Sequence, residues 1–402
     1  MPRMSRLVAL FLCLLVTLPL HRGAHAAAAP SANRLENPGF EQAISGHPWM
    51  PTGWDTSRAG LTTVFFGRDT LLAHGGQYAV TVANVSDLWT FSHNWSQAVL
   101  VDSKDWGKDA VFTIWTRSSG VAGRAYVMLQ AYRDTLSRVA RERHMSRDSV
   151  AVLMHIKAID DPAFVLGWKR TAFSDEETPW VKREARVFIP PLTNVIFVRC
   201  GLLGTGQLML DDASLTFEAP LPAPALQPGV NILKDPSFEE GGLAWEFSVA
   251  PYRNTIGRVD STVAHTGRNS AYFKSGEMGY VTVGSGVSQV ICNRNLSGMH
   301  VKMTGWFKTD SLVSTAYTLM YFSTPSGIVS VATHDRFSLN TPWTQATLEA
   351  DAPKDTYAMW VWYEYNAPAT GELHVDDCAL EVTGPAKPAG GKPAVGKPAG
   401  GH

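Results

Sequence analysis

Aromatic side chains at alternating positions are the residues of this sequence best suited to bind a ligand. If the side chains of Met359 and Val361 point into the core from a strand, those of the residues that alternate with them point away from the core. Trp360, Trp362 and Glu364 then share an open face. Flat rings beside polar groups suit sugars, because the rings pack on the apolar faces of pyranoses while the polar groups bind hydroxyls.

The same alternation selects one candidate ligand-binding set in each half of the chain. The second half supplies Trp306, Tyr317, Tyr321, Trp360, Trp362 and Glu364, and the first half supplies Trp115, Tyr126, Gln130, Tyr132 and Arg199. Large aromatic residues of a sandwich usually lie in its core, and a shift of one residue exchanges the two faces. Each single ring could therefore belong to the core instead of a binding face. The second set combines aromatic and polar residues, and this combination favours ligand binding.

Catalytic motifs are absent from the sequence. It contains no G-x-S-x-G elbow, no H-E-x-x-H, no C-x-x-C and no phosphate-binding P-loop. A glycosidase needs two carboxylates across a cleft, and Glu364 has no repeated partner. We therefore predict a protein that is not an enzyme, with a divergent glycoside hydrolase as a minor alternative.

The chain repeats itself, which indicates its organisation. The motifs recur in one order: N-P-G-F-E at 37–41 as D-P-S-F-E at 235–239, A-H-x-G at 73–76 and 264–267, T-P-W at 178–180 and 341–343, and D-D at 211–212 and 376–377. The first copy carries an insert at about 134–161, for which residues 137–148 predict a short helix or loop and 149–156 an added strand.

Short alternating segments separated by turn residues predict two antiparallel sheets packed face to face in each copy. The predicted fold is all-β, with two tandem sandwich (jelly-roll) domains at 33–217 and 231–383. A Pro-rich linker, 218–230, joins them, and a Gly/Pro/Lys tail, 384–402, follows. Cys292 and Cys378 are the one cysteine pair within a copy. The sequence predicts either a disulfide between them or two buried free thiols, and favours neither.

The first 26 residues have the pattern of a secretory signal: Arg3 and Arg6, then an apolar run at 7–20, then Ala24-His25-Ala26. We expect a secreted or periplasmic protein with no membrane span after signal removal. The net charge of -1 provides no basic surface for nucleic acid.

Taken together, the repeated motifs resemble the CenC-like carbohydrate-binding modules, the group allied to families 4, 9 and 22, which have a galactose-binding-like jelly roll. The resemblance covers nearly all of both copies. It implies a structural Ca²⁺ ion, whose ligands in this sequence would be Glu41, Asp211 and Asp212 in the first copy, and Glu239, Asp376 and Asp377 in the second. Calcium takes six to eight oxygens, so turn carbonyls would complete each set. The alternative is that Glu41 and Glu239 only accept hydrogen bonds from turn backbone.

The sequence thus predicts an exported, non-catalytic protein that binds polysaccharide or cell-surface glycan through aromatic sheet faces, as an accessory to glycoside hydrolases or alone. The rival prediction is a structural or adhesive β-sandwich protein with a protein partner.

Overall fold

The computed structural model describes residues 32–56, 63–86, 92–145, 150, 164–174, 179–249, 255–275, 284–333, 335–366 and 370–386. The predicted signal and the tail beyond Ala386 lie outside these residues. So does the predicted strand at 149–156, except for Val150, which is helical rather than extended. No helix among the residues described is long and apolar enough to cross a membrane.

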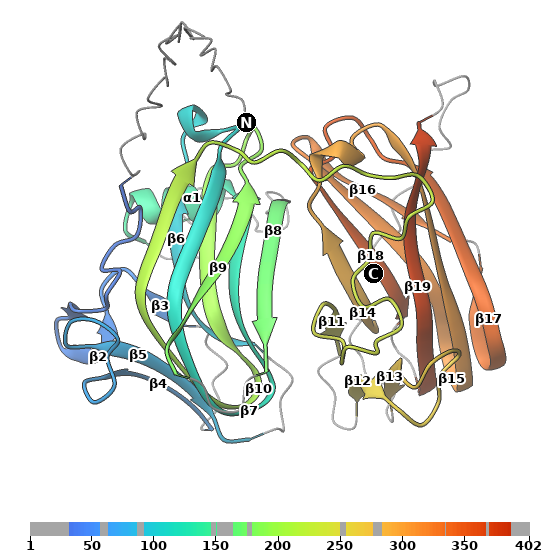
Figure 1. Cartoon of the computed structure of the whole chain (residues 1–402), viewed down its shortest axis with the longest axis horizontal. Helices are drawn as coiled ribbons and strands as arrows, with labels where there is room; N and C mark the ends of the chain where they lie inside the picture. The colour runs from blue at the N-terminus through green and yellow to red at the C-terminus, as the bar shows by residue number, and fades with distance from the viewer. Residues whose placement is uncertain are drawn as a thin grey trace, which may run out of the picture. The chain divides into compact units, whose positions relative to one another are not determined.

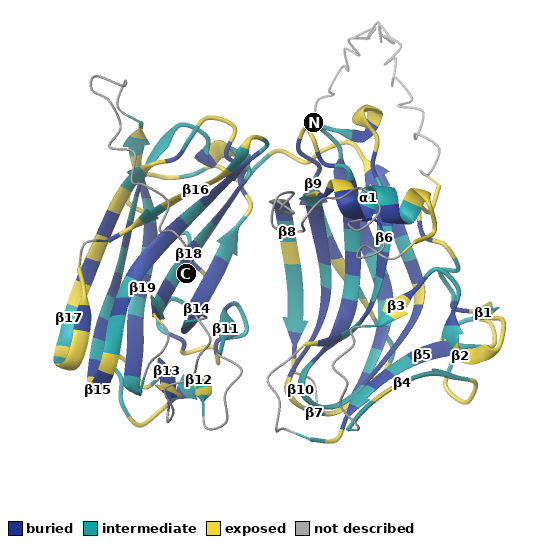
Figure 2. Cartoon of the chain, turned by 180° about the vertical axis from the view of Figure 1, so that it is seen from behind, coloured by how far each residue is buried: buried dark blue, intermediate teal, exposed yellow. Residues whose placement is uncertain are grey.

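The predicted all-β fold is confirmed: antiparallel strands build two β-sandwiches, each with its own apolar core (Figures 1 and 2). In the first sandwich, β7 (Asp109–Arg133) and β10 (Val195–Glu218) pair along almost their whole length and run through both layers. We call the layer with residues 109–117 of β7 sheet I, and the layer with residues 124–133 sheet II.

The other strands of the first sandwich divide between these two layers. Sheet I adds β4 (Val64–Asp69), β5 (Ala79–Asn84) and β9 (Val181–Phe188). Sheet II adds β3 (Asp55–Thr56), β6 (His93–Leu100) and β8 (Phe164–Phe173). A separate hairpin consists of β1 (Ala43–Ile44) and β2 (His47–Pro51), and a 3-10 turn, η1, covers Ser103–Asp105.

Glycines allow β7 and β10 to bend from one layer into the other. Gly123 and Gly204 have φ of 108° and 111°, a backbone region that favours glycine. A Cβ atom on Gly123 would lie 2.3 Å from the Leu203 carbonyl oxygen, and one on Gly204 would lie 2.1 Å from that of Ala122. The two strands therefore approach too closely at the bend for any larger residue.

The second sandwich repeats the plan with one difference. β15 (Met299–Thr324) is the continuous strand, but its partners are separate: β19 (Gly371–Pro385) in sheet I and β18 (Ala358–Tyr365) in sheet II. Sheet I adds β12 (Ile256–Asp260), β13 (Ser270–Ser275) and β17 (Phe337–Asp351); sheet II adds β11 (Glu246–Ser248), β14 (Ser285–Ile291) and β16 (Gly327–Ala332). A 3-10 turn, η2, covers Arg294–Leu296.

The two cores fill equivalent positions with different residues. Ile114 and Cys200 are fully buried in the first core, and the repeat places Gly305 and Tyr363 at the same positions of the second. The Tyr363 ring occupies the space over Gly305, since a Cβ there would lie 2.3 Å from Tyr363 Cε1. The Tyr363 hydroxyl donates to the Thr304 carbonyl at 2.7 Å. A large residue thus compensates for a small one.

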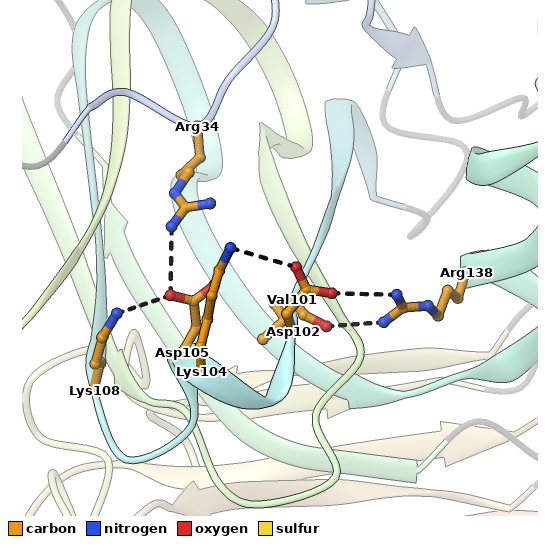
Figure 3. A network of polar contacts seen from close by, with 7 residues as sticks. All are labelled: Arg34, Val101, Asp102, Lys104, Asp105, Lys108 and Arg138. Atoms are coloured by element: carbon orange, nitrogen blue, oxygen red, sulfur yellow. Dashed lines mark hydrogen bonds and ion pairs between the residues drawn. The ribbon is translucent and has the colours of Figure 1, made fainter.

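The insert of the first copy contains α1 (Thr135–Glu142), which overlaps the expected range 137–148 but begins two residues earlier. Asp134 caps it, because its Oδ1 accepts a hydrogen bond from the Ser137 amide at 3.0 Å. Arg138 ties the helix to the sandwich through the Val101 carbonyl and Asp102 (Figure 3).

Two sequence expectations differ from the structure in detail. Cys200, Cys292 and Cys378 are free thiols, so Cys292 and Cys378 form no disulfide, and they are not two buried thiols either, because Cys292 is exposed and Cys378 is buried. The start of the predicted tail belongs to the fold, because β19 extends to Pro385 and Ala386 donates a backbone hydrogen bond to Gly298.

Candidate functional site

The outer face of sheet II in the second sandwich gathers most of the predicted ligand-binding residues. Tyr317 lies opposite Glu364, and Tyr321 lies opposite Trp360, across the β15–β18 pair. Trp362 lies between these two rows on β18. The alternating residues Met359, Val361 and Tyr363 are buried in the core. We call the group Tyr317, Tyr321, Trp360, Trp362 and Glu364 the second face.

Glu364 is held in place by a tyrosine of the same face. The Tyr317 hydroxyl lies 2.7 Å from Glu364 Oε1 and 2.9 Å from Asn366 Oδ1, and the Arg336 guanidinium lies 4.9 Å from the Tyr317 ring centre. Burial raises the pKa of Glu364, although the hydrogen bond from Tyr317 opposes the rise. Burial and the Glu364 charge also raise the pKa of Tyr317.

Trp362 offers a donor that the protein leaves unused. Its indole Nε1 is buried and has no hydrogen-bond partner within the described part of the chain. A buried N–H without an acceptor is unfavourable, so sites that leave one unsatisfied usually meet a ligand or water there. The ring itself is only half-buried, so the second face combines accessible aromatic surface with polar groups.

The predicted residues of the first sandwich, apart from Trp115, share the matching face of its own sheet II. Tyr126, Gln130 and Tyr132 alternate along β7, and Arg199 stands on β10 opposite Met128. The Tyr126 hydroxyl hydrogen-bonds Ser92, and burial raises the pKa of this tyrosine to about 12. We call the group Tyr126, Gln130, Tyr132 and Arg199 the first face.

The expectation that Trp115 and Trp306 share these faces needs correction. Both side chains do point away from the core, but they stand on sheet I, because β7 and β15 change layers between each tryptophan and the tyrosines that follow it. Each indole is covered by the histidine of the A-H-x-G motif. Ring centres lie 4.0 Å apart for His74 and Trp115 and 3.9 Å apart for His265 and Trp306.

Each histidine is also the centre of a repeated polar cluster. His74 Nδ1 lies 2.7 Å from Asp212 Oδ2, and the Trp180 ring meets the imidazole edge-on at 5.7 Å. The second copy repeats this with Asp377 at 2.7 Å and Trp343 at 5.5 Å. The repetition of the histidine and of T-P-W is the sequence signal for this cluster, although it does not show that they meet.

The predicted calcium ligands of the first copy converge on the A-H-x-G turn. Glu41 Oε1 accepts the amides of Gln77 and Tyr78 at 2.9 and 3.1 Å. Asp211 Oδ2 accepts those of His74 and Gly75 at 2.8 and 3.0 Å. Burial raises the pKa of Asp211, against the effect of these amides.

The second copy has the same arrangement. Glu239 Oε1 accepts the Arg268 and Asn269 amides at 2.8 and 2.9 Å, which lower the pKa of Glu239. Asp376 Oδ2 accepts two amides of the turn, yet its burial raises its pKa to about 6. Asp377 differs: burial would raise its pKa, but hydrogen bonds from His265 and neighbouring hydroxyls lower it.

The donor set fits an ion only with help from the backbone. Within the described ranges, no group of three or more His, Cys, Asp or Glu side chains is arranged to hold a metal. The carboxylates of Glu41 and Asp212 nevertheless reach the same turn. A Cβ on Gly76 would lie 2.2 Å from Glu41 Oε1, and one on Gly75 would lie 2.5 Å from Asp212 Oδ2. Carboxylate oxygens with turn carbonyls are the ligands calcium takes.

Sequence reasoning missed some neighbours of the second face. Glu246 stands beside Ser288 in the same row as Trp362, and its strand β11 has three residues, too few for an alternating pattern. Asn366 and Arg336 approach Tyr317 from loops and strand ends, where no periodicity predicts a side chain's direction.

Comparisons with known proteins give likeness to solved structures only. No known family profile and no curated protein matches the chain. One similar structure is the tandem of two family 22 carbohydrate-binding modules of Xyn10C from Paenibacillus barcinonensis, with 13% identity over 89% of this chain and 100% of that chain and a TM-score of 0.30. Another is the C-terminal family 22 module of Clostridium thermocellum Xyn10B, with 15% identity over 42% and 100% and a TM-score of 0.31. The α-L-arabinofuranosidase MgGH51 is similar at 11% identity over 47% and 27%, with a TM-score of 0.31.

Proposed function

We propose that this protein is an exported, non-catalytic binder of polysaccharide or cell-surface glycan, and that the second face is its principal binding surface. The observation that carries the proposal is the row of Trp360, Trp362 and Tyr321 on one outer face, with an unsatisfied indole N–H and a fixed carboxylate beside it.

The chemistry of this face suits a sugar. Indole and phenol rings stack on the apolar side of a pyranose, and their rigidity keeps the loss of conformational entropy on binding small. Glu364 accepts hydrogen bonds from hydroxyls, and the Trp362 N–H donates one. Because Tyr317 already fixes Glu364, the acceptor is in place before the ligand arrives.

Binding without catalysis is proposed because the face lacks a matched pair of acids. Hydrolysis of a glycosidic bond needs one carboxyl as acid and a second across the bond. Glu364 and Glu246 share the face, but they stand on strands separated by β14 and two residues apart in register. From strand spacings of about 4.8 Å and about 3.4 Å per residue, their backbones lie about 12 Å apart.

Calcium remains part of the proposal as a structural ion in each copy. Glu41, Asp211 and Asp212, and their counterparts Glu239, Asp376 and Asp377, would hold it with turn carbonyls and so join the first segment of each sandwich to its last strand. The convergence of these carboxylates on one turn supports this assignment.

Retention of the mature protein on a panel of soluble and insoluble polysaccharides, with and without calcium, tests the proposal. Retention on one glycan class that is lost in Trp362→Ala supports it. Retention on none, together with a folded protein whose aromatic face is covered in an oligomer or by a protein partner, would replace it with the structural or adhesive alternative.

A further inference from the structure

The first and second faces occupy equivalent positions of the repeat but differ in charge. Arg199 of the first face corresponds to Trp362 of the second, and Gly201 corresponds to Glu364. The cation of one face therefore stands where the other has an indole, and the carboxylate of the second face is absent from the first. Faces with opposite charge should select different ligands.

Arg199 is a cation at the middle of the first face, and none of the described carboxylates pairs with it. It stands on β10 between Ser96 of β6 and Met128 of β7. Its guanidinium lies 5.0 Å from the Phe197 ring centre and also hydrogen-bonds the Tyr132 side chain, and these two contacts orient it. Within the described part of the chain, no carboxylate forms an ion pair with Arg199.

Two acidic residues, Asp55 and Asp134, line the same cavity as Arg199, and neither forms an ion pair with it. Asp134 uses both oxygens on Ser137, whose amide and hydroxyl lie 3.0 and 2.6 Å away. Asp55 shares the row of Arg199 but stands two strands away, beyond Ser96. Two strand spacings separate the backbones of Asp55 and Arg199 by about 10 Å.

The insert helix α1 walls an open cavity of about 920 Å³ beside Arg199. Tyr132, Phe197 and Arg199 line it from the sheet, and Arg141 and His144 line it from the helix end. The carboxylates of Asp55 and Asp134 line it as well. Arg141 pairs with Glu36 at 2.8 Å. Because Arg138 fastens the helix to Asp102 (Figure 3), the wall is built into the fold.

A buried polar atom without a partner gives a second, independent sign of a ligand. Gln130 has only 7% of its surface exposed, and its Oε1 has no hydrogen-bond partner among the described residues. It lies on the same face as Arg199, one alternating position after Met128, next to the cavity of about 920 Å³ rather than in its lining. An unsatisfied amide oxygen suits a ligand hydroxyl, just as an unpaired guanidinium suits an anion.

We propose that the first face binds the anionic group of an acidic glycan, a carboxylate or a sulfate, through Arg199, while Gln130 and Tyr132 bind neighbouring hydroxyls. This inference rests on the proposed function and assigns a ligand class to the face that differs most from its counterpart. The guanidinium fork binds either anion through two parallel N–H bonds.

Affinity electrophoresis of the full mature chain with matched polysaccharides tests this inference. The probes are hyaluronate and its carboxyl-reduced form for the carboxylate, and dextran sulfate and dextran for the sulfate. The variants are Arg199→Gln, Arg199→Lys and, as a control of equal charge change on an exposed residue, Lys104→Gln, whose side chain is 71% exposed. Circular dichroism confirms that each variant is folded.

We expect at least one charged probe to bind more tightly than its uncharged counterpart, and Arg199→Gln to weaken that binding about tenfold or more. Arg199→Lys should recover part of it, and Lys104→Gln should match the parent protein. Whichever charged probe is retained identifies the anion. Equal losses in Arg199→Gln and Lys104→Gln would overturn the inference in favour of diffuse charge attraction.

The neutral glycans found in the polysaccharide panel separate this inference from the proposed function. If the parent protein binds a neutral glycan through Trp362 but no charged probe through Arg199, the inference fails and the proposed function stands. If neither neutral nor charged glycan is retained by the folded parent protein, both fail.

Discussion

The imidazole of His265 lies flat on the indole of Trp306, with ring centres 3.9 Å apart and planes at 16°. The same pair recurs as His74 and Trp115 in the first sandwich. In both copies the histidine also contacts the second aspartate of the D-D motif. The stack therefore joins three motifs that are far apart in sequence, which explains why they recur together.

Trp306→Ala should destabilise the protein without removing glycan binding. The indole packs against His265 and stands on the layer opposite the second face, so its loss removes packing between motifs. We expect the free energy of unfolding to fall by about 2 kcal/mol or more in urea titrations. Trp49→Ala, at an indole 44% exposed, is the control. If Trp306→Ala instead abolished glycan retention and left stability unchanged, Trp306 would be part of the binding surface.

Trp360→Ala or Trp362→Ala should weaken glycan binding without destabilising the protein. Both rings lie on the outer side of β18, so truncation leaves the core intact but removes the stacking surface. Retention on the glycan found in the panel should weaken about tenfold or more, whereas the melting temperature should stay nearly unchanged. A large drop in melting temperature for both variants would mean that the rings hold the fold together.

Glu364→Gln should change how stability depends on pH. Burial raises the pKa of Glu364, so the folded protein holds this proton more tightly than the unfolded chain, in which a glutamic acid titrates near 4.5. Its contribution to stability is therefore largest below that pH and is lost as the pH rises through the higher, folded-state pKa. Tyr317 can still donate to the glutamine carbonyl. Urea midpoints over this range should fall less steeply for the variant; parallel profiles would contradict the assignment.

Calcium should raise the melting temperature of the parent protein, and Glu239→Gln should remove much of that rise. The glutamine carbonyl can still accept the Arg268 and Asn269 amides, so melting in chelator should change little. Glu349→Gln, an acid on the exposed strand β17, is the matched control. If calcium shifts the melting temperature of neither the parent nor the control, the carboxylates bind no calcium and only accept hydrogen bonds from the turn amides.

Gly305→Ala should lower stability by about 1–3 kcal/mol, because the added methyl meets the Tyr363 ring at 2.3 Å in a closed core. Gly67→Ala is the control, since a Cβ there meets nothing within 4 Å. Combining Gly305→Ala with Tyr363→Cys, the residue that the first copy has at this position, should recover part of the loss. Equal losses for the single and double variants would disprove the compensation.

Much of the fold could be predicted from the sequence because duplication doubles every weak signal. A lone D-D or A-H-x-G says little, but their recurrence in one order indicates two copies, and alternation indicates which residues are buried. Met359 and Val361 are in the core and Trp360 and Trp362 are outside it, as the alternation predicts.

The layer to which each residue belongs could not be predicted in this way. Alternation gives the inward or outward direction of a side chain, but it does not show that one strand passes through two sheets. Trp306 and Tyr317 both point outward on β15, yet Ser311 at φ 51° lies between them where the strand changes layers. Side-chain partners such as His265 and Trp306 depend on that bend.

The bent hairpin of β7 and β10 has a consequence for how the first sandwich comes apart. Both of its layers contain the same two strands, paired from Asp109 to Tyr132 apart from two register shifts, one near the bend and one between Asp211 and Ser214. The second sandwich has one such strand, since β18 and β19 are separate. Separating the two layers under force would have to disrupt two strands that cross between the layers in the first sandwich, and one such strand in the second. The first sandwich should therefore unfold under force in a single step, whereas the second should unfold one layer at a time.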